Sequence, residues 1–238
     1  MPLNTEATSS IESVVNRPTV RVWDIFVRAF HWSVVAAFFV AYFTEDEFLT
    51  LHVWAGYAIG GFLALRVIWG VVGPRHARFT DFIYAPATVL SYTRDLLAFR
   101  AKRYLGHSPA GGAMIAALLI GLAATVWSGL ELYAAEDGKG PLAGTVTVIG
   151  APAQAAPSEV GARTQVADRG ESGEREGDER KEHGKTGGDE FWEEVHEVLA
   201  NFTLFLVILH IGGVVLASLA HRENLARSMV TGLKRAEE

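Results

Sequence analysis

The sequence contains no cysteine. This absence excludes disulfides, iron–sulfur clusters and any metal centre held by thiolates. The sequence also has no glycine-rich phosphate loop before a strand, and no pattern that indicates nucleic-acid binding. The eight histidines are therefore the main candidates for metal chemistry.

Charged residues are absent from long stretches of the chain. From Tyr104 the first acidic or basic residue is Glu131, and residues 202–220 hold no ionisable side chain except His210. A helix needs about 20 apolar residues to cross a hydrocarbon core of roughly 30 Å. We therefore predict an all-α membrane protein, a bundle of four transmembrane helices in the lipid bilayer, at Ile25–Phe43, Leu49–Val72, Ala110–Leu132 and Glu190–Ala220.

The stretch before the last predicted span differs in kind. Residues 133–189 are rich in glycine, alanine, proline and acidic residues and have little to bury, so we expect a long disordered loop. The stretch from Asp81 to Arg103 is expected to form a short helix that lies along the membrane surface. The predicted organisation is a disordered leader at 1–20, three spans with a loop helix at 21–132, the acidic loop at 133–189, the fourth span at 190–221 and a tail at 222–238.

Lysine and arginine predict the orientation, because they concentrate in cytoplasmic loops. The short turn after the first span, Thr44 to Glu47, has no basic residue. Both termini are therefore expected in the cytoplasm of a bacterium, with the chain crossing its inner membrane and the acidic loop in the periplasm. The basic residues on the cytoplasmic side are Arg17, Arg21, Arg28, Arg75, Arg78, Arg94, Arg100, Lys102, Arg103, Arg222, Arg227, Lys234 and Arg235.

Four histidines lie within the predicted spans. His196 and His210 are fourteen residues apart on one helix, which is about 21 Å and almost four turns, so both face the same way. His52 matches the periplasmic depth of His196, and His31 matches the cytoplasmic depth of His210. Each pair is suited to clamp one planar iron porphyrin between helices, as helical bundles do. Without cysteine, the haem would be a non-covalent b-type haem with two histidine ligands.

Other interpretations of the histidines remain at this point. They can be polar residues that only pack helices together, although four residues in two depth-matched pairs disfavour this. Zinc fits less well, because neither depth offers the four clustered ligands of a structural site.

Two arginines and one further histidine lie near the cytoplasmic depth. Arg66 is fourteen residues after His52, and Arg28 precedes His31 by three. A guanidinium there can pair with a haem propionate or reach the headgroups. His107 precedes the third span, where it can serve helix initiation, a propionate or a quinone headgroup.

The sequence resembles the bacterial cytochrome b561 and nickel-hydrogenase b-type cytochrome family. The resemblance covers about residues 20–135 and 189–235. The motifs that carry it are Arg28-Ala-Phe-His-Trp32, Leu51-His-Val-Trp-Ala-Gly-Tyr57, Arg66-Val-Ile-Trp-Gly70, Gly73-Pro-Arg-His-Ala-Arg-Phe79, Leu105-Gly-His-Ser-Pro-Ala-Gly-Gly112, Glu193-Glu-Val-His196, Leu209-His-Ile-Gly212 and His221-Arg-Glu-Asn-Leu225.

The resemblance implies a diheme cytochrome of respiratory electron transport. It would exchange electrons with the quinone pool and with a periplasmic cytochrome c or a hydrogenase-like redox subunit, and its iron ligands would be His31, His52, His196 and His210. Ser108 stands where this family leads us to expect asparagine, and the loop before the last span is longer than four helices require.

Two other functions are compatible with the sequence. The chain can act directly on a small substrate, such as superoxide or ferric ion, or it can be a haemless membrane anchor. The acidic outer face disfavours an anionic substrate such as superoxide. Whether the chain is itself an enzyme stays open.

The acidic loop supplies none of the predicted ligands, so we expect it to be dispensable for cofactor binding. Deletion of Ser158 to Gly187 should leave the visible spectrum of the purified protein unchanged. Loss of the spectrum would contradict the prediction of a disordered loop. Loss of electron exchange alone would place partner docking in the loop.

Overall fold

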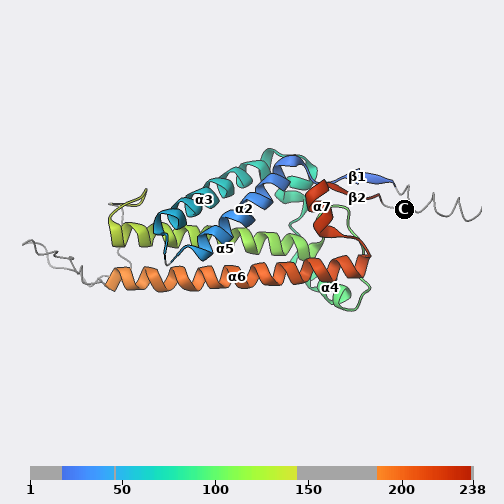
Figure 1. Cartoon of the computed structure of the whole chain (residues 1–238). Coiled ribbons are helices and arrows are strands. Elements are labelled where there is room, and N and C mark those ends of the chain that lie inside the picture. Colours follow the sequence, from blue (N-terminus) through green and yellow to red (C-terminus); the bar gives the residue numbers. More distant parts are fainter. Residues whose placement is uncertain (1–17, 46, 144–186, 237–238) are drawn as a thin grey trace, which may run out of the picture.

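The computed structural model describes residues 18–45, 47–143 and 187–236. Four long helices run side by side: α2 (Ile25–Phe43), α3 (Leu49–Val72), α5 (Pro109–Asp137) and α6 (Gly187–His221) (Figure 1). All four are long and apolar enough to cross a membrane. The predicted membrane protein with four spanning helices is thus confirmed, and the bounds of the first two helices are those predicted.

Local sequence signals fix where the helices begin and end. The Asp24 side chain accepts a hydrogen bond from the Val27 amide (2.9 Å) at the start of α2. Ser108 does the same for the Gly111 amide (3.2 Å), with Pro109 at the first helical position of α5. Such side chains satisfy amides that have no partner within the helix. Gly138, with φ of 61°, ends α5 in the left-handed conformation.

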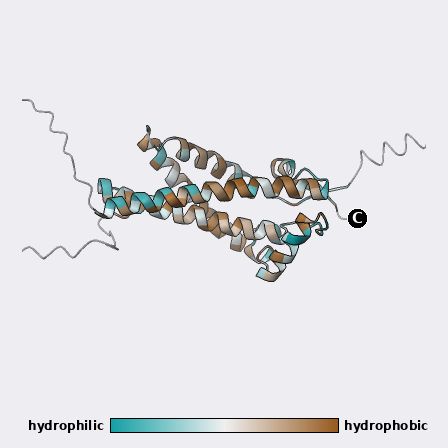
Figure 2. Cartoon of the chain, turned by 90° about the horizontal axis from the view of Figure 1, so that it is seen from below, coloured by the Kyte–Doolittle hydropathy of each residue, from teal (hydrophilic) through white to brown (hydrophobic). Residues whose placement is uncertain are grey.

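The last two spanning helices extend beyond the predicted spans. α5 continues to Asp137 rather than Leu132, and α6 begins at Gly187 rather than Glu190. A helix of 35 residues is about 52 Å long, well beyond the hydrocarbon core. The projecting ends are hydrophilic in Figure 2. The apolar run marks the membrane depth, and in α5 the good helix formers Ala134, Ala135 and Glu136 carry the helix past it.

The predicted disordered segments lie largely outside the described residues. This applies to residues 144–186 of the loop and to 1–17 of the leader. Of the rest, residues 133–137 continue α5, residues 187–189 begin α6, and Thr19–Arg21 form the strand β1.

The helices pack as two hairpins, α2 with α3 and α5 with α6. α3 also packs against α5, whereas α6 makes little backbone contact with α2 or α3. Val34, Phe38, Ile59, Leu63 and Leu122 form the buried apolar core. The space between α6 and the first hairpin is therefore filled mainly by side chains, which is where the predicted histidines lie.

One end of the bundle, here named the capped end, is closed by short elements. These are α4 (Pro86–Leu97), which falls in the stretch predicted to hold a short helix, the 3-10 turns η1 (Arg75–Ala77) and η2 (Phe79–Asp81), α7 (Leu225–Thr231), and an antiparallel pair of β1 with β2 (Leu233–Arg235). Arg103 donates two hydrogen bonds to Glu223, both of 3.1 Å. The buried Lys234 donates to the carbonyls of Tyr104 and Leu105, each at 2.9 Å. The strand pair was not predicted.

Because Lys234 ties β2 to the loop before α5, its ammonium should stabilise the capped end. Lys234→Met keeps most of the aliphatic volume and leaves two carbonyls without their charged donor, which should cost about 2 kcal/mol. A thermal unfolding scan in detergent should show a lower Tm than for the wild type. The exposed Arg227→Met is the matched control, and an equal Tm for both variants would contradict the assignment.

Candidate cofactor site: two histidine pairs

The four predicted histidines meet in two pairs across the space between α6 and the first hairpin. His52 of α3 faces His196 of α6, with ring centroids 5.9 Å apart. His31 of α2 faces His210 of α6 at 6.4 Å. The structure thus brings together the partners that the helix spacing suggested. The His31–His210 pair lies toward the capped end, and the His52–His196 pair lies toward the opposite end, here named the open end.

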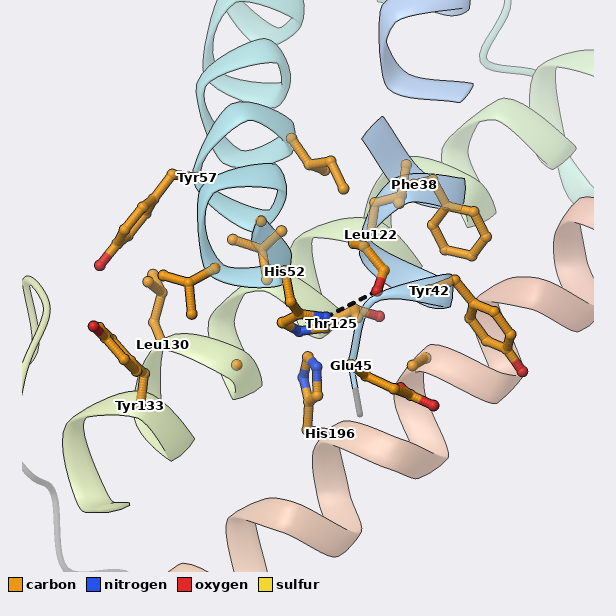
Figure 3. Close-up of a pocket in the computed structure, with 17 residues that line it drawn as sticks. Phe38, Tyr42, Glu45, His52, Tyr57, Leu122, Thr125, Leu130, Tyr133 and His196 are labelled. Atoms are coloured by element: carbon orange, nitrogen blue, oxygen red, sulfur yellow. Dashed lines mark hydrogen bonds between the residues drawn. The ribbon is translucent and has the colours of Figure 1, made fainter. Parts of the chain in front are cut away.

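In the pair at the open end, hydrogen bonds hold both rings. The His52 Nδ1 lies 2.9 Å from the Ala41 carbonyl, to which it donates (Figure 3). The His196 Nδ1 lies 3.0 Å from the Ser128 hydroxyl, which donates to the Thr125 carbonyl. These bonds assign the proton to Nδ1 and leave Nε2 of both rings as the nitrogen with a free lone pair. Such orientation is typical of histidines that bind metals.

A cavity surrounds this pair, with about 730 Å³ of space free of protein atoms, part of it open to the outside. Figure 3 shows His52 and His196 in the cavity, with aromatic and aliphatic side chains around them. Gly129 lies against the His196 ring, where an added Cβ would come within 2.8 Å of Cε1. α5 can thus approach the ring only because this residue has no side chain.

The pair at the capped end has less polar support. The His31 Nδ1 is buried and has no hydrogen-bond partner among the described residues. The His31 ring packs edge-on against Trp32, with centroids 5.1 Å apart. This pair is therefore positioned mainly by packing.

The two predicted arginines both lie near the capped end. Arg66 is only 3% exposed and makes neither a hydrogen bond nor an ion pair with any described residue. Its guanidinium lies over the rings of Phe79 (5.1 Å) and Phe82 (5.8 Å). Arg28 donates to the Val230 carbonyl, and its buried Nε has no partner.

Other residues of the site had no clear signal in the sequence. Ser128 and Gly129 lie in an apolar run in which neither residue type is unusual. Glu131, 4% exposed with a buried Oε2 that lacks a partner, was noted only as the end of that run. The described residues contain no cluster of three histidine, aspartate, glutamate or cysteine side chains suited to hold a bare metal ion.

Facing imidazoles within a membrane bundle are typical of membrane proteins that hold a metal cofactor between helices. The family model described as prokaryotic cytochrome b561 matches residues 22–232 of the chain. The chain belongs to this family, a family of membrane b-type cytochromes, and membership implies b-type haem.

Several curated relatives are similar to the chain. The probable Ni/Fe-hydrogenase B-type cytochrome subunit of Bradyrhizobium diazoefficiens is 28% identical over 162 residues, which cover 56% of this chain and 65% of the relative. The subunit of the same name from Rhodobacter capsulatus is 28% identical over 161 residues, or 55% of this chain and 61% of the relative. The matched part thus spans less than two thirds of either relative. No solved structure matches the chain.

The contact between Gly129 and His196 can be tested with a matched pair of glycines. Gly129→Ala places a methyl group against the ring and should cost about 1–3 kcal/mol through overpacking. Gly61→Ala is the control, because an added Cβ there meets no atom within 4 Å. Thermal unfolding in detergent should show a lower Tm for Gly129→Ala alone. Equal stability of the two variants would show that the helix approach at His196 is looser than described.

Proposed function

We propose that the chain is a diheme b-type cytochrome that carries electrons across the bacterial cytoplasmic membrane. It would link the quinone pool with a redox partner at the other face. The observation that carries the proposal is the presence of two histidine pairs at two depths of one membrane bundle.

The residues present fit two haems with histidine on both faces. Bonds between imidazole nitrogen and a metal are about 2 Å long, so two such bonds in line place the ring centroids roughly 6 Å apart. The separations of 5.9 and 6.4 Å match this arrangement. When bound, haem iron supplies one-electron redox chemistry, and the chain has no cysteine to attach it covalently.

The protein's own part is to orient the ligands and exclude water. His52 and His196 present Nε2 because Nδ1 is already bonded. The buried apolar core of the bundle consists of Val34, Phe38, Ile59, Leu63 and Leu122. Arg66 and Arg28 offer guanidinium groups near the pair at the capped end, where they are suited to haem propionates.

The distribution of charge supports an orientation with the capped end in the cytoplasm. The loop before α5 and the segment after α6 carry ten of the 21 lysines and arginines, whereas the short turn between α2 and α3 carries none. The open end is acidic, with Glu190, Glu194 and Glu197 exposed on α6. An acidic face favours a partner with a basic surface and disfavours superoxide as a direct substrate.

The names of the relatives suggest the kind of partner. Both are described as subunits associated with Ni/Fe-hydrogenase. We therefore favour a hydrogenase-like redox subunit, with a periplasmic cytochrome c as the other candidate, and quinone as the exchangeable substrate at the cytoplasmic side.

The pairing predicts which histidines share a haem. The purified wild type should contain two haems per chain, extractable with acid acetone, in a pyridine haemochrome assay. His52→Ala and His196→Ala should each disturb one and the same haem, and His31→Ala and His210→Ala the other. Redox titration should show the second haem's potential nearly unchanged in each variant, with high-spin features at the disturbed one.

His183→Ala, in the acidic loop, is the control and should retain both haems. A spectrum in which His31→Ala and His52→Ala disturb the same haem would contradict the pairing. Two low-spin haems in all four variants would place the iron ligands elsewhere. Absence of visible absorption in the wild type would instead favour a haemless anchor.

A further inference from the structure

A buried positive charge near the capped end has no hydrogen-bonded counter-charge among the described residues. Arg66 is 3% exposed, forms no ion pair there, and its Nη1 is buried without a hydrogen-bond partner. Asp24 acts on it only through space, because its carboxylate accepts from the Val27 amide and the Trp69 indole. Aromatic rings attract a guanidinium but do not satisfy its N–H groups. A buried cation in this state calls for an anion.

A second donor without a partner lies beside Arg66. The Nδ1 of His107 is buried and unbonded, and the ring lies between Trp23 (4.5 Å) and Phe82 (4.7 Å). Phe82 also packs against the Arg66 guanidinium. Burial, together with the neighbouring Arg66 cation, lowers the pKa of His107 to about 3. The imidazole is therefore neutral at physiological pH and offers a hydrogen bond rather than a second charge.

The two donors lie on the capped side of the His31–His210 pair. Trp69 of α3 is level with Asp24, as their hydrogen bond of 3.5 Å indicates. Arg66 lies three residues from Trp69 along α3, and His31 lies seven residues from Asp24 along α2. Both steps lead away from the capped end. The rise of 1.5 Å per residue places Arg66 about 6 Å from His31 along the bundle. A cofactor ligated by His31 would thus come within reach of Arg66, and His107 packs against the same Phe82 ring as the Arg66 guanidinium.

We infer that Arg66 and His107 together hold one carboxylate, a propionate of the haem bound by His31 and His210. This inference rests on the proposed function and extends it to a residue outside the spans. Guanidinium and neutral imidazole would each donate one hydrogen bond to the carboxylate, and Arg66 would supply the balancing charge. Trp23 and Phe82 hold the imidazole in place. Arg66 and His107 therefore determine how firmly this haem is retained, not its redox chemistry.

The experiment compares natural haem with haem whose propionates are blocked. The His52→Ala background, expected to hold the His31–His210 haem alone, is loaded with haem b or with its dimethyl ester. The rate of haem transfer to apomyoglobin is then followed in detergent by absorbance. Arg66→Gln and His107→Phe should each speed the loss of haem b at least tenfold. The same substitutions should not change the loss of the dimethyl ester, because the group they bind is absent.

Controls separate this outcome from simple misfolding. The exposed Arg75→Gln, at the same end, should leave both rates unchanged. Arg66→Lys and His107→Gln keep a donor and should partly restore retention of haem b. Infrared difference spectra with 13C-labelled propionates should show a carboxylate band in the wild type that shifts in His107→Gln.

Two results would overturn the inference. If the substitutions speed the loss of the dimethyl ester as much as that of haem b, Arg66 and His107 support haem retention without binding a propionate. If the carboxylate band does not move in His107→Gln, the imidazole does not contact a propionate. If the proposed function itself is wrong, the purified His52→Ala variant will contain no haem, and no rate of haem loss can be measured.

Discussion

The position of two imidazoles on one unbroken helix constrains the whole bundle. α6 presents His196 and His210 almost four turns apart on one side. Each faces a partner across the same gap: His52, near the start of α3, lies at the depth of His196, and His31, early in α2, lies at the depth of His210. The hairpin connection between α2 and α3 allows this, because it reverses the chain between the two histidines. The backbone of α6 makes little contact with that of the first hairpin, so these histidine side chains lie in the space between them.

Much of this arrangement could be predicted from the sequence because it depends on local periodicity. Apolar length locates the spans, and the helical repeat fixes which residues share a face, so His31, His52, His196 and His210 could be paired by depth alone. The bounds of α2 and α3 could also be predicted from the sequence. Asp24 caps the start of α2, and Gly73 follows the end of α3. These features require no knowledge of distant contacts.

The features that escaped prediction depend on contacts between distant residues. Thr19–Arg21 and Leu233–Arg235 are too short to show strand alternation, and they form strands only because each pairs with the other. Ser128 bonds His196 through the register of α5 against α6, which no single helix reveals. Arg66 was noticed for its depth, but its lack of a partner and its neighbour His107 are visible only in three dimensions.

The pairing of β1 with β2 also orders events during synthesis of the chain. β1 precedes the first spanning helix, whereas β2 follows the last, so the ribosome produces all four spans before the second strand exists. Until then, Lys234 cannot bind the carbonyls of Tyr104 and Leu105, and the loop that carries His107 lacks that attachment. The strand pair can therefore form only after all four spans have been made. Lys234 fixes the loop that carries His107 at that stage and not before.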